Sequence, residues 1–177
     1  MVIETERLIL RPPCAEDARR VFERYASDPR VTQYLGWPTH RTINDTVAFL
    51  GFCDAEWKRW PAGPFLIESR ASGALMGSTG LNFESPQQAA TGYVLSQDCW
   101  GFGYATEALA AMRELAARLG VTRLYALCHP DHRASSRVLE KCGFVLEGTL
   151  AAYAEFPNLK PGVRDTVLCY AVRLPIC

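Results

Sequence analysis

Hydrophobic and polar residues alternate in several short stretches of the chain, with the period of two that is typical of half-buried β-strands. Residues 5–11 (TERLILR) show this alternation and end at two prolines. Turn-forming glycine, proline and serine residues separate other such stretches. The pattern predicts seven strands, over residues 5–11, 65–69, 75–83, 91–96, 122–128, 144–153 and 165–174.

Elsewhere, apolar residues recur at the three- and four-residue intervals of a helix face. Residues 104–119 form the clearest stripe, and Gly120 suits the end of that helix. The pair Asp28-Pro29 ends an earlier helix, because proline disfavours helical geometry in the residue before it. The spacing predicts four helices, over residues 15–27, 43–59, 104–119 and 133–142.

The predicted order is one strand, two helices, three strands, a helix, a strand, a helix and two strands. This order indicates a mixed α/β fold, and we find no internal repeat or linker in it. A length of 177 residues and an apolar fraction of 49% suit a single packed domain over residues 1–177.

Charge and cysteine content restrict the partners and the compartment. The 19 lysines and arginines balance the 19 aspartates and glutamates, so we expect no nucleic-acid partner. Cysteines are odd in number and form no Cys-x-x-Cys pair, which favours free thiols in a reducing compartment. The N-terminus lacks a signal-peptide pattern, and no segment is apolar enough to span a bilayer. We therefore expect a cytoplasmic protein without a membrane partner.

A glycine-rich turn precedes the clearest predicted helix. Residues 100–106 read Trp-Gly-Phe-Gly-Tyr-Ala-Thr, and Gly101 and Gly103 can adopt backbone angles that are closed to other residues. N–H groups of the turn can then converge at the positive end of the helix dipole, a site suited to a pyrophosphate. A tight strand-to-helix turn without a ligand would contain the same two glycines. A dinucleotide-binding motif is excluded because its third small residue is absent. A P-loop is excluded because the chain has no Gly-Lys-Ser/Thr triplet.

The stretch WGFGYATEA resembles the acyl-CoA pyrophosphate loop of GNAT acetyltransferases, particularly the RimJ/RimL-like branch that acetylates ribosomal-protein N-termini. Four further segments resemble the same branch in the expected order, namely TERLILR, SDPRVTQYLGWP, GSTGLNF and SSRVLEKCGFVLEG. The resemblance covers nearly the whole chain. It implies the acyl-CoA N-acyltransferase fold: a mostly antiparallel seven-stranded sheet with splayed central strands, flanked by about four helices.

The resemblance implies acetyl-CoA as cosubstrate and no metal. Backbone N–H groups of the turn opened by Gly101 should hold the pyrophosphate, namely those of Phe102, Gly103, Tyr104, Ala105 and Thr106. Three strand residues should pair with the pantetheine amides as an added strand would, namely Val94, Leu95 and Ser96. His132 stands where the branch has an asparagine that contacts pantetheine.

Acetyl transfer to an amine requires a neutral amine, a base or water chain, and an acid that protonates the departing thiolate. The family transfers the acetyl group directly, so no nucleophilic cysteine is required. Ser135 matches the serine of the branch's Asn-x-x-Ser motif and is our candidate for the acid, although it is equally explained as a helix cap. Leu139 stands where many other members have a tyrosine acid.

Glu84 and His129 are the remaining candidates for the general base, because the glutamate of many members is replaced at residues 89–91 (AAT). Each is also explained as a turn residue or a cap. The amine acceptor, a protein N-terminus or a small molecule, should contact five residues, namely Trp37, Glu84, Tyr153, Phe156 and Asp165.

Two other interpretations stay open. Cys128, His129, His132 and Cys142 include zinc-ligand types, but their spacing crosses a strand–helix junction rather than forming paired motifs. A catalytically idle acyl-CoA sensor on the same fold is the alternative to an enzyme. Members of the family often form dimers, so a homodimer is a further option.

Overall fold

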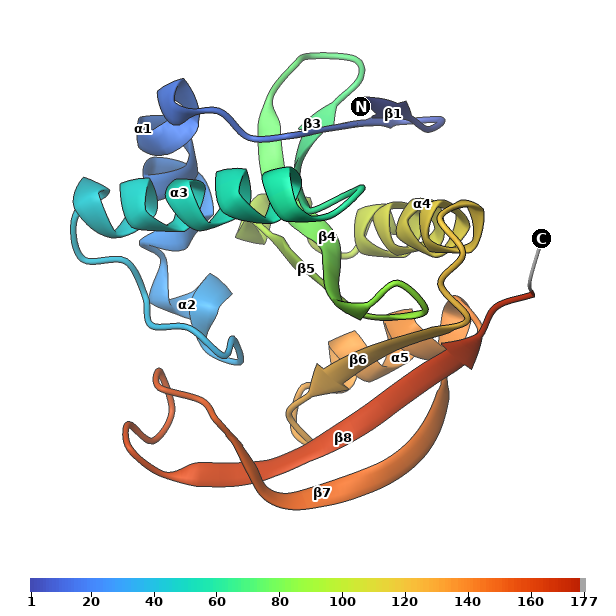
Figure 1. Cartoon of the computed structure of the whole chain (residues 1–177). Helices are drawn as coiled ribbons and strands as arrows, with labels where there is room; N and C mark the ends of the chain where they lie inside the picture. The colour runs from blue at the N-terminus through green and yellow to red at the C-terminus, as the bar shows by residue number, and fades with distance from the viewer. Residues whose placement is uncertain (176–177) are drawn as a thin grey trace.

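One sheet divides the molecule, and helices cover both of its faces (Figure 1). The computed structural model describes residues 1–175. The strands are β1 Ile3–Glu4, β2 Leu8–Arg11, β3 Pro64–Ser69, β4 Leu75–Ser85, β5 Gln88–Leu95, β6 Arg123–Cys128, β7 Val145–Glu155 and β8 Arg164–Arg173. They form one eight-stranded sheet in the order β1-β2-β3-β4-β5-β6-β8-β7. All neighbouring strands are antiparallel except β5 and β6.

The sheet has eight strands where we predicted seven, because Ile3–Glu4 form an additional strand and the predicted strand 5–11 is shortened to Leu8–Arg11. The Thr5 N–H donates to Leu8 O at 2.9 Å, and the Leu8 N–H donates to the Thr5 hydroxyl at 3.0 Å. These bonds close a turn between β1 and β2. The predicted alternation holds within β2, where Leu8 and Leu10 are fully buried.

The helices are η1 Ala15–Asp17, α1 Ala18–Val21, η2 Phe22–Ala26, α2 Pro29–Thr32, α3 Ile43–Arg59, η3 Gln97–Cys99, α4 Tyr104–Arg118 and α5 Arg133–Lys141. The predicted helix 43–59 is confirmed as α3, which begins with a reciprocal Thr42–Asp45 capping box. The one-turn helix α2 was not predicted. Proline occupies its first position, and the Asp28 side chain accepts the Arg30 N–H at 2.9 Å.

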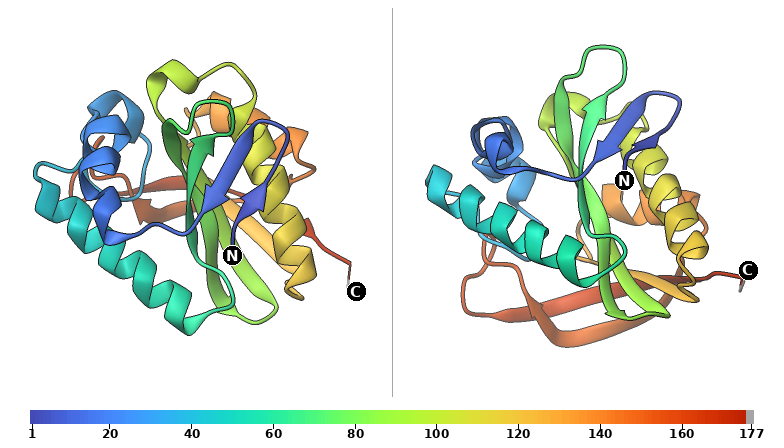
Figure 2. Two further views of the ribbon diagram at one scale, coloured as in Figure 1. Left: turned by 90° about the horizontal axis from the view of Figure 1, so that it is seen from above. Right: turned by 45° about the horizontal axis from the view of Figure 1, so that its top comes forward.

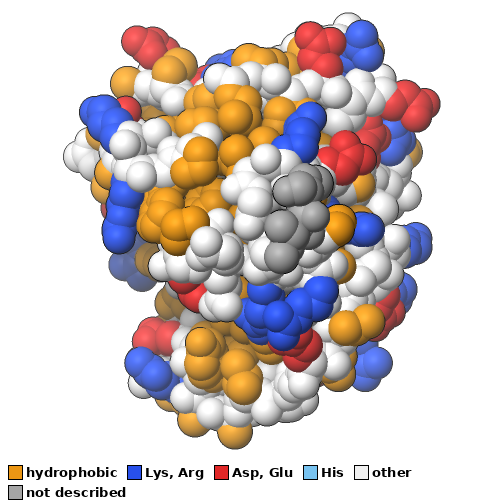
Figure 3. All heavy atoms as spheres, turned by 45° about the vertical axis from the view of Figure 1, so that its right-hand side comes forward, with side chains coloured by type: hydrophobic (Ala, Val, Ile, Leu, Met, Phe, Trp, Pro, Cys, Tyr) orange, Lys and Arg blue, Asp and Glu red, His pale blue; other side chains and the backbone are white. Residues whose placement is uncertain are grey.

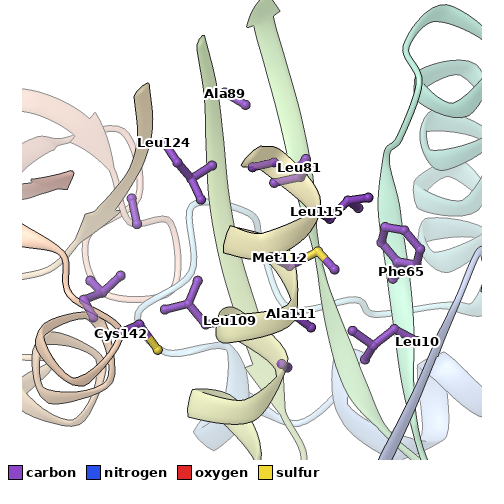
Figure 4. Packing of buried hydrophobic residues seen from close by; sticks show 14 of the residues in the cluster. Leu10, Phe65, Leu81, Ala89, Leu109, Ala111, Met112, Leu115, Leu124 and Cys142 are labelled. Carbon is purple, nitrogen blue, oxygen red and sulfur yellow. The ribbon is translucent and has the colours of Figure 1, made fainter. Parts of the chain in front are cut away.

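Buried side chains form two clusters on opposite faces of the sheet. In the larger cluster, Leu109 and Met112 of α4 pack with Leu81 and Leu124 of the sheet (Figure 4). The smaller cluster joins α1, η2 and α2 to the sheet through Val21, Tyr25, Val31, Leu66 and Val94. Figure 2 shows the same division, with α1–α3 on one side of the strands and α4 on the other.

Charged side chains of both signs are interspersed with apolar ones over the face shown in Figure 3. No helix within residues 1–175 has the length and apolar content needed to cross a membrane.

Candidate functional site

The central strands β5 and β6 run side by side over only a short length. Their parallel pairing joins Gln88–Ala90 to Arg123–Tyr125. Farther along, Gly92–Val94 of β5 and Ala126–Cys128 of β6 line a common cavity of about 610 Å³. The predicted splaying of these two strands is therefore confirmed, and it opens a slot in the middle of the sheet.

The glycine-rich turn leads from η3 into α4 and has the geometry that the sequence predicts. Gly101 and Gly103 have φ values of 84° and 81°, and Gly103 is the N-cap of α4. Within residues 1–175, no group accepts a hydrogen bond from the backbone N–H groups of residues 101–106. The positive end of the α4 dipole lies at the same place. The turn can thus hold an anion with main-chain donors alone.

Side chains from the start of the chain fix this turn in place. The Glu107 carboxylate accepts hydrogen bonds from the Thr5 hydroxyl (2.6 Å), the Arg7 N–H (2.8 Å) and Arg7 Nε (2.7 Å). Arg7 Nη1 donates to Phe102 O at 2.9 Å, and the guanidinium lies 4.5 Å from the centre of the Tyr104 ring. Burial raises the pKa of Glu107, but these hydrogen bonds outweigh it and lower the pKa overall.

Of the three residues predicted to pair with pantetheine, Leu95 turns its backbone toward the slot. The Ser96 N–H donates to Met76 O in β4 at 2.8 Å. Hydrogen-bonding direction alternates along an antiparallel strand, so Val94 also faces β4 and Leu95 faces the other way. The Trp100 indole N–H donates to Leu95 O at 2.8 Å and thereby joins the turn to the end of β5.

Ser135 lines the cavity and forms a pair with Tyr93 of β5. The Tyr93 hydroxyl donates to Ser135 O at 3.0 Å and lies 3.0 Å from Ser135 Oγ. Burial raises the pKa of Tyr93, so its phenol stays protonated. The N-cap of α5 is His132 rather than Ser135, and the capping explanation for Ser135 therefore does not hold. Sequence reasoning missed Tyr93, which had no feature to separate it from a core aromatic.

His132 also lines the cavity, and its ring stacks on that of Tyr34 at 4.8 Å between centroids. Burial, together with the neighbouring His129, lowers the pKa of His132. Its imidazole is therefore neutral at physiological pH and able to accept a proton. In the part of the chain that the structure describes, its ring nitrogens form no hydrogen bond.

His129 is buried beside the cavity rather than in its lining. Its Nδ1 accepts the Asp131 N–H at 3.1 Å, so the lone pair of that nitrogen is engaged. Nε2 lies 3.7 Å from Asp165 Oδ2, and the ring meets Phe156 edge-on at 4.8 Å. With its lone pair already engaged, His129 is poorly placed to act as a base.

The structure separates the five predicted acceptor residues. Trp37 and Phe156 line the cavity, whereas Glu84, Tyr153 and Asp165 are not among its lining residues. Hydrogen bonds from Tyr125 and Gln88 engage the Glu84 carboxylate and lower its pKa. Asp165 accepts the Thr166 N–H at 2.7 Å and lies 3.5 Å from Lys160 Nζ. The lining also contains aromatic and imidazole side chains that we did not predict, namely Tyr34, His40, Phe49 and Phe52.

The cysteine and histidine residues considered for zinc do not form a site. Among residues 1–175, no group of three His, Cys, Asp or Glu side chains is arranged to hold a metal ion. Cys128 Sγ lies 3.4 Å from Ser136 Oγ, whereas Cys142 Sγ donates to Thr106 O at 3.4 Å. All six cysteines within residues 1–175 are free.

Comparison with known proteins identifies the family. Residues 7–145 match the family described as Acetyltransferase (GNAT) domain. The uncharacterized N-acetyltransferase YoaA of Bacillus subtilis is 30% identical over 155 residues, which cover 86% of this chain and 87% of YoaA. A GNAT-family acetyltransferase from Bacillus anthracis is 26% identical, with a TM-score of 0.83 and 98% of each chain covered.

The ribosomal L7/L12 α-N-protein acetyltransferase RimL, solved with coenzyme A, has the same fold. It is 23% identical, with a TM-score of 0.84 and 98% of each chain covered. The predicted resemblance is thus confirmed by sequence over most of the chain and by structure over nearly all of it. The chain belongs to the GNAT acetyltransferase family and is an acyltransferase.

Proposed function

We propose that this chain, acting as one domain over residues 1–177, transfers the acetyl group of acetyl-CoA to a primary amine by direct attack in a ternary complex. The observation that carries the proposal is the row of N–H donors at residues 101–106 that have no acceptor within residues 1–175. Trp100 joins this turn to the end of β5, the strand that borders the slot leading to Ser135. Those donors suit the pyrophosphate of acetyl-CoA, and the Leu95 backbone suits a pantetheine amide. The thioester then lies beside Ser135.

His132 acts as the general base in this proposal, in place of Glu84 or His129. The amine nitrogen attacks the thioester carbonyl carbon, the new C–N bond forms and the C–S bond breaks. The imidazole of His132 takes the proton that the amine loses. Its lowered pKa supports this role, because the ring is already neutral before the amine binds.

The Ser135 hydroxyl gives its proton to the departing thiolate. The proton that His132 took from the amine returns to Ser135 through solvent as the products leave, while Tyr93 keeps its own proton and orients the serine hydroxyl. When Tyr93 donates to the Ser135 carbonyl, the Ser135 hydroxyl points back to Tyr93. When Tyr93 donates to Ser135 Oγ instead, the serine proton becomes free for the sulfur, because a phenol has one proton. The products are the N-acetyl amine and coenzyme A.

Acetyl-CoA turnover with a panel of primary amines tests this function. We expect free thiol to be released only when an amine is present, together with an amine product that gains one acetyl group by mass spectrometry. Tight acetyl-CoA binding without turnover on any amine would instead support an idle acyl-CoA sensor. Failure to bind acetyl-CoA at all would remove the basis of the proposal.

A further inference from the structure

The cavity continues from Ser135 to the face of the sheet that carries α2 and α3. Gly36 and Trp37 after α2, together with Phe49 and Phe52 of α3, line this part of it. The α4 N-terminus, where the donor pyrophosphate is placed, lies with α4 on the opposite face (Figure 2). The part of the cavity under α2 and α3 is therefore left for the acceptor.

Flat rings form one wall of this part of the cavity. The Trp37 ring stacks on Phe49 at 6.4 Å and is tilted against His40 at 5.1 Å, and His40 lies 6.3 Å from Phe49. We call Trp37, His40 and Phe49 the aromatic wall. Phe52, on the same helix as Phe49 and 48% exposed, extends the apolar surface outward.

His40 adds no charge to the aromatic wall. Its Nδ1 lies 2.8 Å from the hydroxyl of the buried Thr46, and burial lowers its pKa despite the nearby Asp45. The ring is therefore neutral at physiological pH, and it packs against Trp37 and Phe49 instead of offering a charge to an anion.

Formal charge is almost absent from the cavity. Among its described lining residues, Glu155 alone carries a full charge at neutral pH, and no lysine or arginine takes part. A polyamine or an aminoglycoside has several cationic groups, which would need several carboxylates. An acidic peptide or a nucleotide has anionic groups, which would need arginine or lysine. Neither kind of acceptor matches this lining.

We propose, building on the acetyl transfer proposed above, that the acceptor is a small arylalkylamine whose amine is its only charged group. Its ring lies on the aromatic wall, and its amine reaches toward His132 and the thioester. Glu155, whose carboxylate accepts the Gly162 N–H at 2.7 Å, attracts the incoming ammonium. The cavity of about 610 Å³ must also hold the acetyl end of the donor, so the part under α2 and α3 suits a ring of modest size.

Initial rates at saturating acetyl-CoA test this class directly. The panel contains 2-phenylethylamine and tryptamine, the matched non-aromatic 2-cyclohexylethylamine, spermidine and a peptide with an acidic N-terminal sequence. We expect kcat/KM for the two arylalkylamines to exceed kcat/KM for spermidine and for the peptide by at least about tenfold. It should exceed kcat/KM for 2-cyclohexylethylamine by about threefold, because only the aromatic ring can stack on the aromatic wall.

A substitution in the aromatic wall tests where the ring of the acceptor binds. Phe49→Leu should raise KM for 2-phenylethylamine about tenfold, while KM for acetyl-CoA stays unchanged. Val47→Ala, on an exposed residue of the same helix that is not in the cavity lining, should change neither constant. An unchanged KM for 2-phenylethylamine in Phe49→Leu would overturn the placement of the ring.

Failure of this inference can be told apart from failure of the proposed function. Faster turnover of spermidine or of the acidic peptide than of the arylalkylamines would overturn the acceptor class, while acetyl transfer itself would stand. If acetyl-CoA bound but no amine of the panel were acetylated, the acyl-transfer proposal and the acceptor class would both fall.

Discussion

At the scale of single residues, the proposed chemistry depends on the hydroxyl pair of Tyr93 and Ser135. Ser135→Ala removes the proton donor and should lower kcat about 100-fold, the lower end of what a positioned general acid contributes. Tyr93→Phe keeps Ser135 but removes the hydroxyl that orients it, so a smaller decrease, about tenfold, is expected. Steady-state kinetics check both, and an unchanged kcat in Ser135→Ala would rule out its role as the acid.

His132 permits a prediction about pH. Because its pKa lies below the usual value near 6.5, kcat at saturating substrates should rise with pH through a limb centred below 6.5. His132→Asn should remove this limb and lower kcat about 100-fold, with little change in KM for acetyl-CoA, since an asparagine amide can still donate and accept hydrogen bonds there. A limb that persists in His132→Asn would assign the base to another group.

Sequence reasoning at this scale found Ser135 and His132 but also named Glu84 and His129. Ser135 and His132 face the cavity, whereas the side chains of Glu84 and His129 are engaged by other groups. Glu84 lies near the end of β4 and His129 follows β6, yet the Tyr125 hydroxyl binds the first and the Asp131 N–H engages the second. Such contacts depend on how distant segments pack, and spacing along the chain does not contain them.

At the scale of elements, the turn before α4 depends on backbone angles. Gly103→Ala places a Cβ on a residue with φ of 81°, which costs about 1 kcal/mol of folding stability. Relaxation of that strain redirects the N–H groups, so the Kd for acetyl-CoA should rise about tenfold or more. Calorimetric titration measures the Kd, and thermal unfolding measures the stability.

Gly73→Ala is the matched control for this prediction. Gly73 has φ of 69°, has no atom within 4 Å of an added Cβ, and lies in the turn between β3 and β4. The same strain there should lower stability by a similar amount and leave the Kd unchanged. Equal Kd values for the two variants would mean that the turn at Gly103 does not bind the donor.

At the scale of the whole molecule, a buried ionic network connects the first strand pair to η1. Arg11 donates to Asp17 at 2.7 Å and to Glu68 of β3 at 2.9 Å. The Asp17 side chain is 4% exposed. Burial raises its pKa, but hydrogen bonds from Arg11 and Cys14 outweigh this and lower the pKa to about 2.

This network predicts how stability depends on pH. The folded pKa of Asp17 is below its unfolded value of 3.8, so its contribution is present above pH 4 and is lost as the pH falls to about 2. Asp17→Asn should lower the free energy of unfolding by roughly 2 kcal/mol at pH 7. The variant should also lose less stability than the parent protein as the pH falls from about 4 to about 2. Denaturant unfolding at several pH values measures both effects.

Asp54→Asn serves as the control for Asp17→Asn, because Asp54 forms an exposed pair with Lys58 on α3. An exposed pair of this kind contributes less than about 1 kcal/mol. A similar loss in the two variants would show that net charge, rather than the buried network, sets the acid sensitivity.

The sequence was sufficient for every element whose pattern is local. Helices α3, α4 and α5, the longer strands and the turn at Gly101 and Gly103 follow from side-chain periodicity and from the angles that glycine permits. Tertiary packing decided the rest. The Thr5 turn is held against Glu107, about a hundred residues away, and the cavity lining comes from segments far apart in the chain. Such contacts form only when the sheet brings these segments together, so no pattern along the chain could specify them.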